Sequence, residues 1–355
     1  MHAPDDPAGR PDPLAGRLPV TLLTGFLGSG KTTLLAQLLP QAAMRGAAVV
    51  INEVGEIGID HDLIAYSSEN ISVLANGCIC CTVRTDLQET LRELCGSRRA
   101  GTVPDFDRVV IETTGLADPA PVVQTLVSDS FLGAHFRLDG VITLIDAAQG
   151  AELLINEPDA VQQVALADRI LLTKTDLASP AEVAALDAEL TSINSSAELQ
   201  HVLHGRIDAE QLIGLGLASA RASSATLSFL GRRLDRLEAT PPGTGGSEGA
   251  PLRRHKSGIG TLALRFDTPF DWDAFTAAME LLTRLRGPDL LRAKGIVNVE
   301  GRPVVMQCVR HIFHPPVPLN DWPSSDRSSR LVFITRHIDA AMIRGLFEAV
   351  GRIAS

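Results

Sequence analysis

A glycine-rich segment near the amino end of the chain restricts its fold more than any other feature. The segment Gly25–Thr32 reads GFLGSGKT and fits the pattern G-x-x-x-x-G-K-[ST] without a mismatch. It follows a β-rich run, Leu18–Leu23, and leads into an amphipathic helical pattern over Thr32–Met44. A strand, a glycine-rich turn and a helix in this order are the context in which this motif binds phosphate. The sequence therefore predicts a P-loop.

The residue types of the motif suit phosphate chemistry. Glycines let backbone N–H groups surround phosphate oxygens, and the helix N-terminus adds a positive dipole. We expect Lys31 to contact the β- and γ-phosphates, Thr32 to bind Mg²⁺ through its hydroxyl, and Thr33 to reach the α-phosphate. The residues expected to bind the nucleotide here are Gly25, Gly28, Ser29, Gly30, Lys31, Thr32 and Thr33.

Apolar runs alternate with helical patterns through the first half of the chain. Near-continuous Val, Ile and Leu runs between helices are typical of a mostly parallel sheet covered by helices on both faces, so we expect an α/β fold. Further strands are expected at Ala47–Asn52, Ile71–Ala75, Arg108–Glu112, Gly140–Asp146, Arg169–Thr173 and Glu198–Val202. Helices are expected at Asp86–Cys95, Pro119–Val127 and Pro180–Ser192.

Two further segments complete the expected nucleotide site. The apolar strand before Glu112 ends in that acid and runs into a loop with Gly115. In P-loop proteins an acid at this place holds the Mg²⁺ shell, and an amide of the loop contacts the γ-phosphate. We therefore assign catalytic roles to Lys31, Glu112 and Gly115.

A third segment, Thr173–Asp176, reads TKTD and is close to the N-K-x-D element of GTPases. The Asp176 carboxylate can accept both the N1–H and the N2–H of guanine, and the stem of Lys174 can pack on the base. These features favour GTP over ATP. Thr173 stands where Asn is usual, and loss of the amide that ties neighbouring loops predicts a looser base pocket.

Composition divides the chain and limits its functions. Residues 238–257 are dense in Pro, Gly and Ser and are expected to form a linker. We expect a disordered tail over 1–17, a P-loop GTPase domain over 18–237, and a small α+β domain over 258–355. Elements expected in that last domain are strands at Ile259–Phe266, Ala293–Val299, Val304–Phe313 and Leu331–Thr335, and helices at Trp272–Leu285 and Ile338–Val350.

The chain has 32 Lys and Arg against 42 Asp and Glu, a net charge of −10, which argues against nucleic acid as a partner. No apolar run reaches the roughly 20 residues of a membrane span, so no membrane is expected. Residues 1–17 carry no apolar core of a secretory signal, and an odd number of cysteines is typical of intracellular thiols. We expect a cytoplasmic protein.

Three of the five cysteines, Cys78, Cys80 and Cys81, lie in a C-x-C-C pattern after an expected strand. Thiols so close together can converge on one soft or borderline cation from a loop. Zinc prefers four ligands, so the loop alone is one ligand short. Cobalt, zinc, iron and nickel all remain compatible with these thiolates. Cys95 and Cys308 continue apolar patterns and are expected in the core.

Taken together, the motifs resemble the CobW-type family of P-loop GTPases, relatives of GTPases that help insert nickel into enzymes. The segments that carry the resemblance are GFLGSGKTT at Gly25–Thr33, NEVGEIGID at Asn52–Asp60, NGCICC at Asn76–Cys81, ETTGLADPAP at Glu112–Pro121, TKTD at Thr173–Asp176 and RSSRLVFITR at Arg327–Arg336.

The resemblance implies GTP hydrolysis coupled to delivery of a transition metal, zinc or cobalt first, into a client metalloprotein. It also implies that Glu53 positions Mg²⁺ or the attacking water, and that Glu56 joins the thiols as a metal ligand. A homo-oligomer is compatible with this assignment. Two alternatives are a P-loop ATPase or kinase acting on a small molecule, and a non-catalytic zinc-binding regulatory protein that binds GTP.

Overall fold

The computed structural model describes residues 16–52, 64–67, 71–74, 79–82, 87–215, 253–254, 258–319 and 321–353. In residues 52, 64–67, 71–74, 79–82, 253–254 and 351–353 it describes only the backbone. Within the described chain, residues 16–188 and 197–215 form one compact unit, and residues 189–196 and those from 253 onward belong to another. No helix in these residues is long and apolar enough to cross a bilayer.

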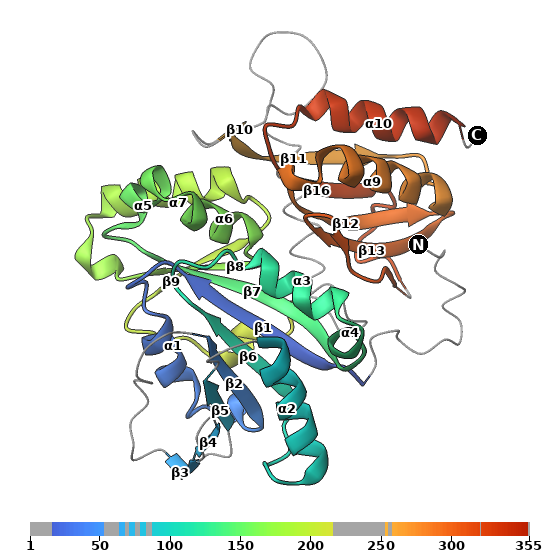
Figure 1. The fold of residues 1–355 in the computed structure, drawn as a ribbon. Coiled ribbons are helices and arrows are strands. Elements are labelled where there is room, and N and C mark those ends of the chain that lie inside the picture. Colours follow the sequence, from blue (N-terminus) through green and yellow to red (C-terminus); the bar gives the residue numbers. More distant parts are fainter. Residues whose placement is uncertain are drawn as a thin grey trace. The chain divides into compact units, whose positions relative to one another are not determined.

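The first unit is built on a sheet whose central strands are parallel (Figure 1). Its strand order is β3-β4-β5-β2-β6-β1-β7-β8-β9, and β4 runs antiparallel to both of its neighbours at the edge. The strands are β1 (Leu18–Gly25), β2 (Ala47–Asn52), β3 (Ile64–Ser67), β4 (Ile71–Leu74), β5 (Ile79–Thr82), β6 (Arg108–Thr113), β7 (Phe136–Asp146), β8 (Arg169–Thr173) and β9 (Glu198–Val202). The expected mostly parallel sheet is confirmed.

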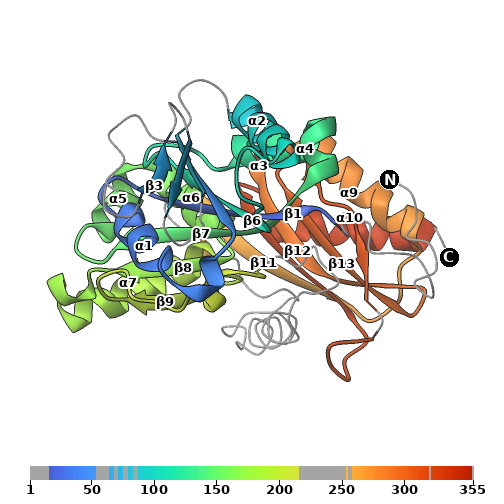
Figure 2. The same cartoon turned by 90° about the horizontal axis from the view of Figure 1, so that it is seen from below.

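Helices cover both faces of this sheet. Leu34, Leu35 and Leu38 of α1 pack on one face, against strand residues that include Leu23 and Val49. Helix α6 lies against β1 and β7 on the other face, and Figure 2 shows α2, α3 and α4 grouped together. The helices are α1 (Lys31–Leu38), α2 (Leu87–Ala100), α3 (Ala120–Ser128), α4 (Ser130–His135), α5 (Gly150–Asn156), α6 (Pro158–Leu166) and α7 (Pro180–Ile193), with 3₁₀ turns η1 (Ala42–Met44), η3 (Thr175–Leu177) and η4 (Ala209–Leu212).

The first helix is shorter than its apolar pattern predicts. A single helix over Thr32–Met44 was the expectation, but α1 ends at Leu38 and a separate turn, η1, follows. Pro40 is the physical reason, because proline lacks a backbone N–H and its ring clashes with the preceding helical turn. The periodicity is nevertheless informative, since Leu34, Leu38 and Met44 are all buried in the same core.

The second unit holds an antiparallel sheet with two helices on one face. Its order is β10-β11-β16-β12-β13-β14, with β15 paired to β13. Phe275 of α9 and Phe347 of α10 pack with Phe333 of the sheet in one core. The elements are β10 (Arg253–Arg254), β11 (Ile259–Phe266), α9 (Trp272–Arg286), η5 (Gly287–Asp289), β12 (Leu290–Val299), β13 (Arg302–Val309), β14 (Ile312–Phe313), β15 (Val317–Pro318), β16 (Ser329–Arg336) and α10 (Ala340–Ile353).

Two expectations for this unit are corrected. The predicted single strand Val304–Phe313 is a hairpin, because Arg310 takes a left-handed backbone conformation at φ 53° and the chain reverses there. Part of the predicted linker is a short strand, since Arg253 and Arg254 pair with Thr261 and Gly260. The other residues of the predicted linker, 238–252 and 255–257, lie outside the described residues. So do residues 1–15 of the predicted tail.

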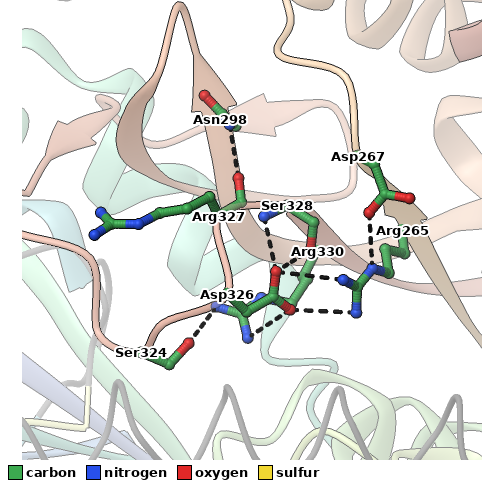
Figure 3. A network of polar contacts seen from close by, with 8 residues as sticks. All are labelled: Arg265, Asp267, Asn298, Ser324, Asp326, Arg327, Ser328 and Arg330. Atoms are coloured by element: carbon green, nitrogen blue, oxygen red, sulfur yellow. Dashed lines mark hydrogen bonds and ion pairs between the residues drawn. The ribbon is translucent and has the colours of Figure 1, made fainter.

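A polar network fastens the segment before β16 to the sheet (Figure 3). Asp326 accepts hydrogen bonds from the backbone N–H of Ser328 at 2.9 Å and from its hydroxyl at 2.7 Å. The same carboxylate forms ion pairs with Arg265 at 3.3 Å and with Arg330 at 3.5 Å. Arg265 lies on β11 and Arg330 on β16, so Asp326 joins two strands through ion pairs.

Candidate nucleotide and metal site

The glycine-rich loop connects β1 to α1, as predicted. Gly28 and Gly30 have φ of 76° and 95°, in the left-handed region that favours glycine. A Cβ on Gly25 would lie 2.5 Å from the backbone oxygen of Leu144, so the close approach of β7 requires glycine there as well. The loop therefore has the backbone conformations that direct N–H groups inward in a P-loop.

Lys31 opens α1 and its side chain is buried over the loop. Its Nζ donates to the carbonyl of Gly25 at 2.8 Å and to that of Phe26 at 3.3 Å. The ammonium is thus held by the loop whose N–H groups would bind phosphate. A phosphate bound by this loop would lie close to that charge, and the contact of Lys31 with the β- and γ-phosphates stays a prediction.

Thr32 and Glu112 come together from distant parts of the chain. The Thr32 hydroxyl donates to Oε1 of Glu112 at 3.4 Å. Glu112 is fully buried near the carboxyl end of β6, and it lies beside Leu23 of β1 in the parallel register. A hydroxyl and a carboxylate at this spacing are oxygen ligands of the kind that Mg²⁺ prefers, so the two residues fit a Mg²⁺ ion.

Gly115 follows β6 and lies directly against the P-loop. A Cβ at this position would be 2.6 Å from the backbone nitrogen of Leu27, so no side chain fits there. The loop that holds Gly115 thus contacts the loop that would hold the phosphates. A contact between a backbone N–H of this loop and the γ-phosphate requires such closeness. That contact would not depend on any side chain in the loop.

The segment expected to read the base, residues 173–176, is called the base-reading segment. It begins at the last residue of β8 and lies next to the phosphate loop. Thr173 donates its hydroxyl to the carbonyl of Ser29 at 2.8 Å, so it makes the loop-to-loop tie that was expected to be lost without Asn. Lys174 has a left-handed backbone at φ 54°. Asp176 lies in η3 with its carboxylate exposed. An exposed acceptor beside the P-loop is available to a base.

Sequence reasoning missed one partner of this segment. Nζ of Lys174 forms an ion pair with Oδ2 of Asp146 at 2.7 Å, and Asp146 is almost fully buried at the end of β7. Its other oxygen accepts from the N–H of Ala148 at 2.8 Å. The signal was present, because Asp146 ends a predicted parallel strand and ligand-binding residues gather at that edge of such sheets.

The expected thiol loop is corrected in part. Cys80 and Cys81 lie within the short strand β5 and pair with Val49 and Val50 of β2. They are in a strand because β5 completes hydrogen bonds with β2 on one side and β4 on the other. Cys78 precedes this strand and, with Glu53 and Glu56, lies outside the described residues.

Strand order places the thiol segment beside the nucleotide strands. β2 lies between β5 and β6, and its last residue, Asn52, pairs with Thr113 just after Glu112. The segment with Glu53 leaves from this end of β2. One strand therefore connects the backbone of the cysteine segment to the edge of the sheet where the phosphate loop lies.

The other cysteines are buried and unpaired by disulfide, as predicted for core residues. Burial raises the pKa of the Cys95 thiol, and it raises that of Cys308 strongly, so neither thiol has the character of a metal ligand. Among the residues whose side chains are described, no group of three or more His, Cys, Asp or Glu is placed to hold a metal.

Comparison with known proteins gives a consistent result for both compact units. Residues 19–201 match the profile described as CobW/HypB/UreG, nucleotide-binding domain, and residues 259–351 match the cobalamin synthesis protein cobW C-terminal domain. The chain belongs to the CobW family. The resemblance inferred from the motifs is thus confirmed, and so is the arrangement of a P-loop domain followed by a smaller α+β domain.

Relatives of known description cover nearly the full length. The chain is 36% identical to the zinc chaperone YjiA of Escherichia coli over 93% of this chain and 98% of that protein. It is 31% identical to the zinc chaperone CobW of Pseudomonas aeruginosa over 96% and 94%. The crystal structure of the Zn(II)-bound YjiA GTPase from E. coli superposes with a TM-score of 0.71 at 33% identity, covering 94% of this chain and 99% of that one.

Proposed function

We propose that this protein is a GTPase that binds a transition metal and delivers it to a client metalloprotein. One observation carries the proposal: the strand with Cys80 and Cys81 is hydrogen-bonded to β2, which neighbours the strand of Glu112. The proposed thiolate ligands and the proposed Mg²⁺ ligand therefore lie on the two strands that flank β2 in one sheet. The family and its relatives, named zinc chaperones and a Zn(II)-bound GTPase, support the same assignment.

In the nucleotide half, Lys31 neutralises the β- and γ-phosphates, and Thr32 with Glu112 holds Mg²⁺ when the ion is bound. When bound there, the ion would neutralise negative charge on the β- and γ-phosphates. Gly115 contacts the γ-phosphate, and Asp176 selects guanine. Glu53 follows the last residue of β2 in the sequence and is assigned to the water or to the Mg²⁺ shell.

In the metal half, Cys78, Cys80 and Cys81 supply thiolates and Glu56 a carboxylate, which together make four ligands. Zinc suits this set because it accepts both thiolate and carboxylate in a tetrahedral site. The names of the relatives favour zinc over cobalt. The metal is cargo, so the partner is a client protein that receives it. A cytoplasmic location belongs to the proposal and rests on the free thiols.

The mechanism is a shift in the populations of two states. GTP and Mg²⁺ reposition the segments that carry Glu53 and Gly115, and β2 connects the first of these to the cysteine strand. Metal affinity then differs between the GTP and GDP states. Linkage requires that bound metal change the preference for GTP over GDP by the same factor.

The test is the Zn²⁺ affinity of the full chain, measured by competition with a chromogenic chelator, in the presence of GDP and of a non-hydrolysable GTP analogue. A coupling of about 1–3 kcal/mol predicts a shift of roughly 5- to 150-fold between the two states. GTP turnover is measured with and without Zn²⁺ in parallel. Equal affinities in the two nucleotide states reject the delivery mechanism, even where both ligands bind tightly.

A further inference from the structure

One polar side chain in the core of the nucleotide-binding unit takes no part in the site described so far. Gln163 lies in α6 and is fully buried. Its Nε2 donates to the carbonyl of Gly115 at 3.2 Å and to the carbonyl of Ala117 at 3.0 Å. An amide NH₂ group has two N–H donors, so Gln163 commits both of them to the loop after β6.

The two carbonyls also fix the orientation of this amide. Oε1 of Gln163 is buried and has no hydrogen-bond partner in the described chain. Turning the amide over would point that oxygen at the two carbonyl oxygens and place the NH₂ group where no acceptor lies. A buried acceptor without a partner weakens a fold, so an apolar side chain would fill this space better. Packing alone therefore does not explain why a glutamine lies at this buried position, whereas its two hydrogen bonds to the loop do.

Gly115 is held from two sides by this arrangement. Leu27 of the P-loop blocks one side, where a Cβ on Gly115 would lie 2.6 Å from its nitrogen. Gln163 holds the carbonyl on the other. Because the peptide unit is planar, fixing the carbonyl of Gly115 also fixes the N–H of Leu116. Movement of this loop at a γ-phosphate must break or carry both hydrogen bonds to Gln163.

The helix that carries Gln163 is itself tied to the sheet. The backbone carbonyl of Gln163 accepts a hydrogen bond from the hydroxyl of Thr143 in β7 at 2.8 Å. Helix α6 then leads into β8, which ends at Thr173 and its bond to Ser29. The Gly115 loop is therefore anchored to the same strands that position the P-loop and the base-reading segment.

We propose that Gln163 is a positioning residue for GTP hydrolysis. Its amide holds Gly115 at the γ-phosphate and so sets how strongly the protein distinguishes GTP from GDP. The inference rests on the proposed γ-phosphate contact of Gly115. Gln163 acts through the loop, so its loss changes the step that involves the γ-phosphate and leaves the binding of the base and the α- and β-phosphates intact.

The central variant is Gln163→Met, which keeps the length of the side chain and removes both donors. We expect kcat for GTP to fall on the order of 10- to 100-fold, since small misplacement of a reacting contact has effects of that size. Affinity for a non-hydrolysable GTP analogue falls toward that for GDP, and GDP affinity stays within about twofold, because the contacts that GDP makes are elsewhere.

Gln200→Met is the matched control. It makes the same substitution at an amide in β9 whose Nε2 donates to Oε1 of Gln211 at 2.9 Å, and it leaves both hydrogen bonds of Gln163 to the loop in place. We expect its kcat and its preference for GTP over GDP to stay near those of the wild type. Thermal unfolding of each variant reports any loss of fold separately from loss of turnover.

Gln163→Glu adds a measurement, the pH dependence of turnover, that a change in packing alone would not alter. Its carboxylate would face the two carbonyls and repel them, whereas the protonated acid regains one O–H donor. We expect turnover relative to the wild type to recover as the pH falls, at constant GDP affinity. This series also decides the matter if Gln163→Met does not fold, because turnover that does not recover overturns the proposal.

Gly115→Ala separates this inference from the proposed function beneath it. Its Cβ would collide with Leu27, so turnover should be lost if the loop contacts the γ-phosphate. An inactive Gly115→Ala together with a Gln163→Met that matches the wild type in kcat and in GTP preference rejects only the role of Gln163. A Gly115→Ala that hydrolyses GTP normally rejects the role of the loop itself.

Discussion

The side-chain hydroxyl of Thr173 donates a hydrogen bond to the main-chain carbonyl of Ser29 at 2.8 Å, across 144 residues of sequence. Thr173 ends β8 and is buried, and Ser29 is in the P-loop. The bond fixes the base-reading segment relative to the phosphate loop. A hydroxyl here performs the tie for which an Asn amide was expected, so the sequence difference does not by itself loosen the pocket.

Replacing Thr173 by Val should weaken GTP and GDP binding equally. The change keeps the shape of the side chain and removes one neutral hydrogen bond, worth about 0.5–1.5 kcal/mol, or roughly 2- to 10-fold in affinity. Titration calorimetry with both nucleotides is the measurement. Thr173→Ser keeps the hydroxyl and should bind both nucleotides like the wild type. A Val variant with wild-type affinity would show that the tie does not position the base.

Replacing Lys31 by Ala should abolish GTP hydrolysis. The ammonium lies at the loop whose N–H groups would bind the phosphates, and its contact with the β- and γ-phosphates is charge-assisted. Phosphate release from GTP, followed in the presence of Mg²⁺, is the measurement. Turnover near that of the wild type would contradict the assignment of the P-loop.

Exchanging Asp176 for Asn should change the preferred base. The carboxylate accepts two N–H groups of guanine, whereas an amide can donate to the carbonyl oxygen that xanthine has in place of the guanine amino group. GTP affinity should fall and XTP affinity should rise. Competition between the two nucleotides measures this directly. Unchanged GTP binding would mean that Asp176 does not read the base.

Cys80→Ala should separate metal binding from nucleotide binding. Removing the central thiolate of a three- or four-ligand site costs much of the metal affinity, while the P-loop and TKTD segments are unaltered. GTP binding should survive and the effect of Zn²⁺ on turnover should disappear. Cys95→Ala is the matched control, since that thiol is buried in the core. Zinc affinity retained in Cys80→Ala would remove Cys80 from the site.

Asp139→Asn should raise the melting temperature at neutral pH. Burial raises the pKa of Asp139, although the N–H of Gly214 and the charges of Arg137 and Arg108 lower it. The folded state therefore binds the proton more tightly than the unfolded state, and the stability cost grows as the pH rises above about 4. The gain of the Asn variant should vanish in acid, where both states of the wild type are protonated. Melting temperatures over a pH series check this.

Asp326→Asn should show the opposite sign and serves as the contrast. Burial raises the pKa of Asp326, but hydrogen bonds from Ser328 and the charges of Arg330 and Arg265 together lower it below its usual value. The carboxylate therefore stabilises the fold above a pH of about 4, and this contribution is lost as the pH falls. The variant should lower the melting temperature at neutral pH and converge with the wild type in acid.

Much of the architecture follows from local pattern. The strands Ala47–Asn52, Arg169–Thr173, Glu198–Val202 and Ile259–Phe266 have the bounds that their apolar runs predict. Breaks in these patterns were harder to place. Helix α1 ends early because of Pro40, and the chain reverses at Arg310. The backbone conformation of a single residue sets each of these breaks, while the neighbouring apolar residues keep the same periodicity.

By itself, the sequence determined the strand, loop and helix around Gly25–Thr32, and the residue types at Glu112 and Asp176, because motif chemistry and local periodicity are properties of adjacent residues. The tertiary structure alone decided which of these groups meet. The contact of Thr32 with Glu112, the pair of Lys174 with Asp146 and the hold of Gln163 on the Gly115 loop all depend on strand order. That order is set by how the whole sheet buries its two faces, and no local window of sequence contains it.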